Sequence, residues 1–164
     1  MKRMMALILV FCMLGGFSIA ETAAVDAVSS ASVADFYADG MLTGDDLMNA
    51  INSFTGFYAV ASVNADGKTP NLGFYIYSCF KVEDTYYLML GLSPNQTTAN
   101  IDNGSELVAM YAALPAEGTN YPTSGARMSL KKVEDETLIE TLLQMAPQGY
   151  NPMFYEVTAV RSLG

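Results

Sequence analysis

The sequence contains no histidine among its 164 residues, and this absence limits the chemistry that the protein can perform. Without histidine there is no Ser-His-Asp triad, no imidazole for proton transfer and no ligand set for the commonest zinc and non-haem iron sites. The carboxylates do not form a catalytic pair, because Glu136 and Glu140 lie on a predicted solvated helix face and Glu83 and Asp84 form a turn. There is also no glycine-rich phosphate loop or calcium loop, so we assign no metal ligand and no catalytic residue. An enzyme built from these side chains therefore needs a cofactor.

One segment, residues 93–104, carries hydroxyl and amide side chains at the start of a predicted short helix. The backbone N–H groups at the start of a helix, assisted by the hydroxyls of Thr97 and Thr98, suit an anion such as phosphate. The alternative is that Ser93 or Thr97 only caps the helix and that Asn100 faces solvent. Composition alone favours this alternative.

A second group of residues is aromatic and lies in a predicted strand. Tyr75 and Tyr77 share one face of this strand, and Phe74 and Phe80 share the other. Such side chains can line a flat pocket for a ring system, or they can be ordinary sheet packing. Packing is the default interpretation.

The elements that must position these residues follow from two periodicities. Apolar residues at helical spacing predict helices, and alternating apolar residues predict strands, with Asp66-Gly67 as a strong hairpin turn. The predicted helices are residues 44–53, 94–103 and 135–145, and the predicted strands are residues 57–63, 71–80, 85–90, 106–113, 125–133 and 153–160. Because hairpins join most consecutive strands, we predict a mainly β fold, an antiparallel barrel or sheet with helical insertions.

The N-terminal segment is typical of a secretory signal. Lys2 and Arg3 precede an uncharged apolar run over residues 4–17, and Ser18 and Ala20 supply small residues for a peptidase. The alternative is an uncleaved N-terminal anchor. We therefore predict a signal peptide over residues 1–20, a flexible leader over residues 21–40 and one domain over residues 41–164, located outside the cell or in the cell envelope.

Composition and cysteine content narrow the classes further. Hydrophobic residues make up 51% of the chain, which favours a folded core, and 8 basic against 17 acidic residues argue against a nucleic-acid binder. After signal cleavage Cys79 is the only cysteine left, so no internal disulfide can form. Its apolar neighbours favour a buried small side chain over a reactive thiol.

Taken in order, these segments resemble the pyridoxamine 5′-phosphate oxidase-like family, the FMN-binding split barrels, over residues 42–163. Residues 57–71 resemble the family's opening hairpin with its "D-G-x-P" turn, and residues 97–103 resemble its "K-x-x-N-I-x-x-N" helix. Residues 125–130 resemble its "G-x-R-L-x-G" strand, and residues 154–161 resemble its closing "F-x-V-x-E-V-R" strand.

This resemblance implies a six-stranded antiparallel split barrel that forms a homodimer, with two FMN sites at the dimer interface. Met110 and Tyr111 are expected on the partner surface. The resemblance places the flavin phosphate near Ser93, Thr97, Thr98 and Asn100 and the flavin ring near Asn71, Gly73, Phe74 and Tyr75, with Arg127 as a further candidate.

Two functions follow from the resemblance. The first is a secreted FMN-dependent oxidoreductase acting on a small molecule, and the second is a non-catalytic small-ligand or flavin-binding module that has lost redox activity. The sequence departs from the family because no Arg or Lys occurs over residues 71–78 or 95–98, where the family places cations. The family's Arg-x-His substrate motif is also absent, which excludes pyridoxal phosphate synthesis. We expect no nucleic-acid partner and no stable membrane insertion after cleavage.

Overall fold

The computed structural model describes residues 37–147 and 152–164. The predicted signal peptide, residues 1–20, lies outside the described residues, as does most of the predicted leader. Within the predicted domain, only residues 148–151 are left undescribed. No helix in the described ranges is long and apolar enough to cross a membrane.

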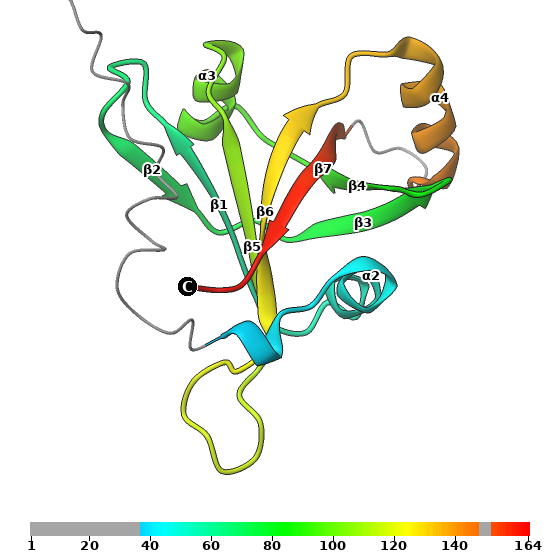
Figure 1. Cartoon of the computed structure of the whole chain (residues 1–164). Helices are drawn as coiled ribbons and strands as arrows, with labels where there is room; N and C mark the ends of the chain where they lie inside the picture. The colour runs from blue at the N-terminus through cyan, green and yellow to red at the C-terminus, as the bar shows by residue number, and fades with distance from the viewer. Residues whose placement is uncertain (1–36, 148–151) are drawn as a thin grey trace, which may run out of the picture. The chain divides into compact units, whose positions relative to one another are not determined.

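Three α-helices, one 3-10 helix and seven strands make up the described part of the chain (Figure 1). The helices are η1 (Ala38–Gly40), α2 (Gly44–Asn52), α3 (Gln96–Asp102) and α4 (Glu136–Met145). The strands are β1 (Phe57–Val63), β2 (Pro70–Gly73), β3 (Tyr77–Val82), β4 (Thr85–Leu90), β5 (Leu107–Ala112), β6 (Gly125–Lys132) and β7 (Met153–Arg161). Each of the three α-helices lies within a range predicted from the sequence.

Helix α2 is stabilised mainly by its apolar face. Leu47 and Ile51, one helical turn apart, are both buried against the sheet. Asp45 and Asp46 lie in the first turn, where the helix dipole favours acidic side chains. Thr43 occupies the N-cap position, but its side chain makes no capping hydrogen bond.

The N-cap of α3 differs from both predicted candidates. Asn95 caps this helix, because its Oδ1 accepts a hydrogen bond of 3.1 Å from the backbone N–H of Thr98. Thr97 lies inside the helix and is buried, and Ser93 lies before the cap. The alternative that Ser93 or Thr97 caps the helix and that Asn100 faces solvent is therefore wrong, since Asn100 is fully buried as well.

The seven strands form one antiparallel sheet in the order β2-β1-β5-β6-β7-β4-β3. Strands β2 and β3 are the two ends of this order, although only residues 74–76 separate them in the chain. Such a short connection brings the two edges of the sheet near each other, so the sheet must curl. The fold is the predicted mainly β split barrel with helical insertions.

The predicted strand over residues 71–80 is two strands, so the sheet has seven strands where six were expected. Its first part pairs with β1, with Asn71 opposite Ser62, and its second part pairs with β4, with Cys79 opposite Leu88. One straight strand could not pair with partners at both ends of the sheet. The chain therefore leaves the extended ladder over residues 74–76.

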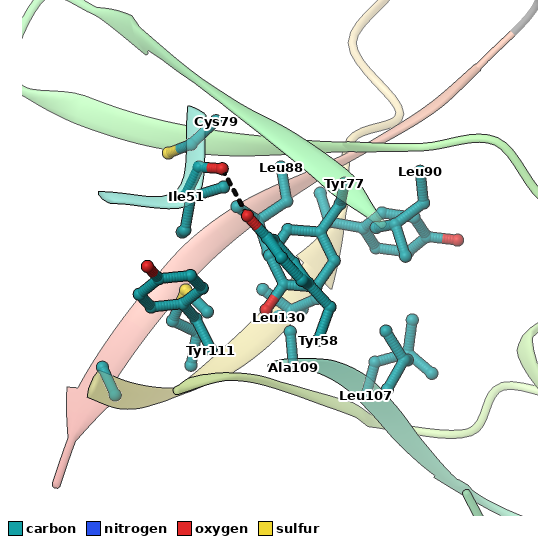
Figure 2. Packing of buried hydrophobic residues seen from close by; sticks show 14 of the residues in the cluster. Ile51, Tyr58, Tyr77, Cys79, Leu88, Leu90, Leu107, Ala109, Tyr111 and Leu130 are labelled. Carbon is teal, nitrogen blue, oxygen red and sulfur yellow. Dashed lines mark hydrogen bonds between the residues drawn. The ribbon is translucent and has the colours of Figure 1, made fainter. Parts of the chain in front are cut away.

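An apolar core fills the inside of the curled sheet (Figure 2). Tyr58 lies at its centre, edge-to-face with Tyr77 at a centroid distance of 5.1 Å and with Tyr111 at 5.3 Å. Leu47 and Ile51 of α2 belong to the same cluster. The inward direction of Tyr77 confirms the packing interpretation for that residue.

A second, smaller core lies between α4 and the opposite side of the sheet. Leu142 of α4 packs with Tyr87 and Met89 of β4 and with Phe154 of β7. On β2 and β5, by contrast, the outward side chains include exposed large apolar residues. Helix α4 thus covers only the part of the outer surface formed by β4, β7 and their neighbours.

Candidate functional site

Four of the side chains that the sequence singled out, those of Asn71, Tyr75, Thr97 and Asn100, meet between α3 and the β1–β2 hairpin. We call this group the polar cluster. It consists of Ser62, Asn64, Asn71, Tyr75, Gln96, Thr97 and Asn100. Ser62 is buried on the side of β1 that faces the core, and Asn71 lies directly opposite it on β2.

Thr97 is the acceptor at the centre of the polar cluster. Its Oγ1 accepts one hydrogen bond from Asn71 Nδ2 and another from the hydroxyl of Tyr75, both at 2.9 Å. Only 1% of Thr97 is exposed. Three predicted site residues that are up to 26 positions apart in the chain therefore contact one another.

Asn100 is the second centre, and its side-chain amide is fully engaged. Its Nδ2 donates to Ser62 Oγ and to Asn64 Oδ1, both at 2.9 Å. Its Oδ1 accepts a hydrogen bond of 2.7 Å from Gln96 Nε2. A fully buried amide is stable only when its polar atoms have partners, and here both amide hydrogens and the oxygen have them.

Gly73 lies under the ring of Tyr75. A Cβ atom added at Gly73 would overlap that ring, with Cζ at 2.9 Å and the hydroxyl oxygen at 3.0 Å. The absence of a side chain at Gly73 is thus what allows the ring to lie against β2. The surface that the resemblance assigned to a flavin ring is covered by a side chain of the protein itself.

The remaining predicted site residues do not join the polar cluster. Ser93 is exposed, and its carbonyl accepts a hydrogen bond of 2.9 Å from Thr98 Oγ1. Phe74 is 67% exposed and takes no part in these hydrogen bonds. Arg127 lies on β6 between the buried residues Ala126 and Met128, so its side chain points to the opposite face of the sheet from theirs. Its Nε donates a hydrogen bond of 2.7 Å to the carbonyl of Ser162.

Three members of the polar cluster were missed by the sequence reasoning: Ser62, Asn64 and Gln96. One signal was available for Ser62, which holds an inward position of the alternating strand 57–63 whose other inward residues are apolar. A small polar residue at such a position needs a buried partner. Asn64 and Gln96 carried no comparable signal.

The polar cluster does not fit a flavin phosphate. Such a dianion needs donors that are free to bind it, preferably cationic ones. The side-chain donors here are uncharged, and those of Asn71, Tyr75, Gln96 and Asn100 already donate to acceptors in the chain. At the start of α3, the N–H groups of Thr98 and Ala99 already donate to Asn95.

Two features outside the polar cluster lie around α2. A cavity of about 20 Å³ is lined mainly by apolar side chains, among them Leu47, Met128 and Val160, and has room for about one water molecule. The Cys79 side chain also lines this cavity, and burial raises the pKa of its thiol to about 12. Cys79 is therefore a thiol near neutral pH, which agrees with the predicted role as a buried small side chain.

The described residues include no group of three or more histidine, cysteine, aspartate or glutamate side chains that could hold a metal ion.

Among solved structures, the chain is similar to the crystal structure of "a putative pyridoxamine 5′-phosphate oxidase" from Lactobacillus delbrueckii, with 18% sequence identity and a TM-score of 0.48. The similarity covers 74% of this chain and 91% of that protein. No protein-family profile matches the chain, and no curated protein matches it. The class of protein defined by the strand order above is a split barrel, and no activity or ligand is carried over from the similar structure.

Proposed function

We propose that this chain is a non-catalytic binding module of the split-barrel fold, which holds a small uncharged ligand through hydrogen bonds. The observation that supports the proposal is the composition of the polar cluster, which consists of amides and hydroxyls with no carboxylate, amine, guanidinium or thiol. Such groups recognise a neutral polar molecule well. Their hydroxyls are weak nucleophiles on their own, and the cluster supplies no general base to activate them near neutral pH.

The charge of the protein supports the same conclusion. The chain carries a formal net charge of −9, and no side-chain hydrogen bond links a lysine or arginine to the polar cluster within the described ranges. An anionic ligand would therefore meet a repulsive field without a compensating cation. A neutral ligand avoids this cost.

Equilibrium dialysis of the purified protein against FMN and against riboflavin tests the proposal, because the two share one ring system and differ in the phosphate. We expect that FMN binds no more tightly than riboflavin and that the protein is colourless after desalting. A preference for FMN of more than tenfold, about 1.4 kcal/mol, would contradict the proposal. The spectrum of oxidised FMN retained on desalting would contradict it as well.

A secreted FMN-dependent oxidoreductase is the second candidate. The observation that favours it is the contact of Asn71, Tyr75 and Thr97, three residues that the family resemblance assigned to one flavin site. Reduction of bound flavin by NADH or NADPH, followed at the flavin absorption band, would establish this candidate in place of the first.

We propose that the protein is a homodimer through the outer surface of β1, β2 and β5. Leu72 is 73% exposed on this surface and Val108 is 39% exposed, and monomers seldom expose large apolar patches. The expected position of Tyr111 on this surface is wrong, because Tyr111 is buried in the core. Neighbouring residues of a strand face opposite sides of the sheet, so Met110 faces outward. Light scattering should give twice the monomer mass, and Leu72→Glu should reduce it to the monomer mass.

We also propose that the protein is secreted after cleavage of residues 1–20. Expression of the full chain in a bacterium, followed by N-terminal sequencing of the protein from the medium or the envelope fraction, should give Glu21 as the first residue. An intact Met1 in the membrane fraction would instead show an uncleaved anchor.

A further inference from the structure

Tyr75 occupies a position that a planar ligand could take. Its ring lies over Gly73, and its hydroxyl donates a hydrogen bond of 2.9 Å to Thr97 Oγ1. The ring is therefore held on one side by the backbone of β2 and at its tip by a buried hydroxyl. Any ring in this position would find the same flat surface and the same acceptor.

The acceptor at the tip of the ring is well fixed. Asn71 Nδ2 donates to the same Thr97 Oγ1 and is also 3.2 Å from Ser62 Oγ, so the oxygen stays in place if the Tyr75 hydroxyl leaves. Because Thr97 is buried, losing the bond from Tyr75 would remove a partner that water cannot easily replace. A replacement ligand is thus favoured if it brings its own hydroxyl.

Tyr75 is also the member of the polar cluster best placed to move. It lies in the middle of residues 74–76, which belong to no strand, and its neighbours Phe74 and Ile76 are 67% and 59% exposed. Tyr75 itself is only partly buried, whereas Tyr77, two residues further on, is 2% exposed in the core. Rotation of this short connection would displace the exposed side chains of Phe74 and Ile76 together with Tyr75, which packs only at the margin of the core.

We propose that Tyr75 is an internal occupant of a ring-binding slot formed by Gly73, Asn71 and Thr97, and that the slot takes an uncharged planar ring bearing a hydroxyl group. This inference rests on the proposed function and names its ligand class. It also explains why the flavin site expected from the resemblance is closed, since the surface beside Gly73 is taken by a side chain two residues away.

The test uses p-cresol, which is the side chain of tyrosine as a free molecule, and 4-methylanisole, which has the same ring but no hydroxyl to donate. Binding is measured by titration calorimetry and by the rise in melting temperature. Tyr75→Ala should bind p-cresol at least tenfold more tightly than the wild type, because the wild-type slot must first release its own ring. Tyr75→Phe keeps the ring but loses the hydrogen bond to Thr97, so it is the matched control and should bind p-cresol more tightly than the wild type but less tightly than Tyr75→Ala.

Two further measurements separate the slot from a cavity that any large-to-small substitution would create. Tyr75→Ala should prefer p-cresol over 4-methylanisole by about fivefold to tenfold, the value of one hydrogen bond. Adding Thr97→Val should remove this preference. Equal binding of the two probes, or no gain of p-cresol binding in Tyr75→Ala, would overturn the inference.

The outcomes also distinguish this inference from the proposed function. If Tyr75→Ala binds p-cresol selectively while the wild type prefers FMN more than tenfold over riboflavin, the slot exists and the proposed function is wrong. If the wild type shows no such preference and Tyr75→Ala does not bind p-cresol more tightly than the wild type does, the inference of a slot is wrong and the proposed function stands.

Discussion

Removing the hydroxyl group of Tyr77 should stabilise the protein. Tyr77 is 2% exposed, and its hydroxyl oxygen is the one buried side-chain polar atom in the described ranges without a hydrogen-bond partner. Burial raises the pKa of this phenol far above its usual value, which is a further sign of an apolar environment. The ring itself packs edge-to-face against Tyr58 and would keep that contact in Tyr77→Phe.

The magnitude follows from the cost of leaving a buried polar group unpaired. That cost is about 1–3 kcal/mol, so Tyr77→Phe should gain about 1 kcal/mol in the free energy of unfolding after the loss of some packing. Two other core tyrosines, Tyr58 and Tyr111, are matched controls with the opposite sign. The Tyr58 hydroxyl donates to the carbonyl of Ile51 at 2.6 Å, and the Tyr111 hydroxyl donates to that of Thr55 at 2.8 Å. Tyr58→Phe and Tyr111→Phe should each lose about 1 kcal/mol.

Urea unfolding followed by far-UV circular dichroism measures all three variants under identical conditions. An unchanged dependence of the unfolding free energy on urea concentration would show that the comparison is between similar folded and unfolded states. The melting temperature of Tyr77→Phe should rise by about 2–6 °C. If Tyr77→Phe loses as much stability as Tyr58→Phe, the Tyr77 hydroxyl has a partner and the reasoning is refuted.

Three further predictions concern the contacts of α2. The side chain of Asn52 joins α2 to β3, because it donates a hydrogen bond of 2.7 Å to the carbonyl of Cys79 and accepts one of 2.8 Å from the N–H of Cys79. Asn52→Ala should therefore lower the free energy of unfolding, measured in urea, by about 2–3 kcal/mol. A loss below about 0.5 kcal/mol would show that water replaces these two hydrogen bonds. Hydrogen bonds from the Tyr86 hydroxyl and, to a lesser extent, from Lys81 lower the pKa of Asp45. The ionised carboxylate therefore stabilises the fold at pH values above the ordinary pKa of 3.8, and this stabilisation is lost as the pH falls through the lowered pKa. Asp45→Asn should therefore lower the melting temperature at pH 7 and lower it progressively less as the pH falls below 3.8, and an equal loss at every pH would contradict this assignment. Burial raises the pKa of the Cys79 thiol to about 12, so this thiol should react slowly with Ellman's reagent in the native protein and quickly in urea. Fast labelling of the native protein would show an accessible thiolate and contradict this prediction.

The local elements could be predicted from the sequence because their causes are local. The spacing of Leu47 and Ile51 defines the buried face of α2, and no distant residue is needed to recognise it. The turn at Asp66-Gly67 is equally local, since Asp66 accepts hydrogen bonds from the backbone of Lys68 and Thr69, and Gly67 adopts a positive φ of 67°. Composition is simpler still, because a chain without histidine has no imidazole chemistry in any fold.

The division of the predicted strand 71–80 and the state of the candidate site were decided by the tertiary structure. The chain bends over residues 74–76 because β2 and β3 pair at opposite ends of the sheet, a condition that no local pattern expresses. That bend turns Tyr75 toward Thr97, which lies 22 residues further along the chain, and the hydrogen bond between them closes the site. The sequence therefore determined which polar groups were present, and their distances after folding decided that they bind one another.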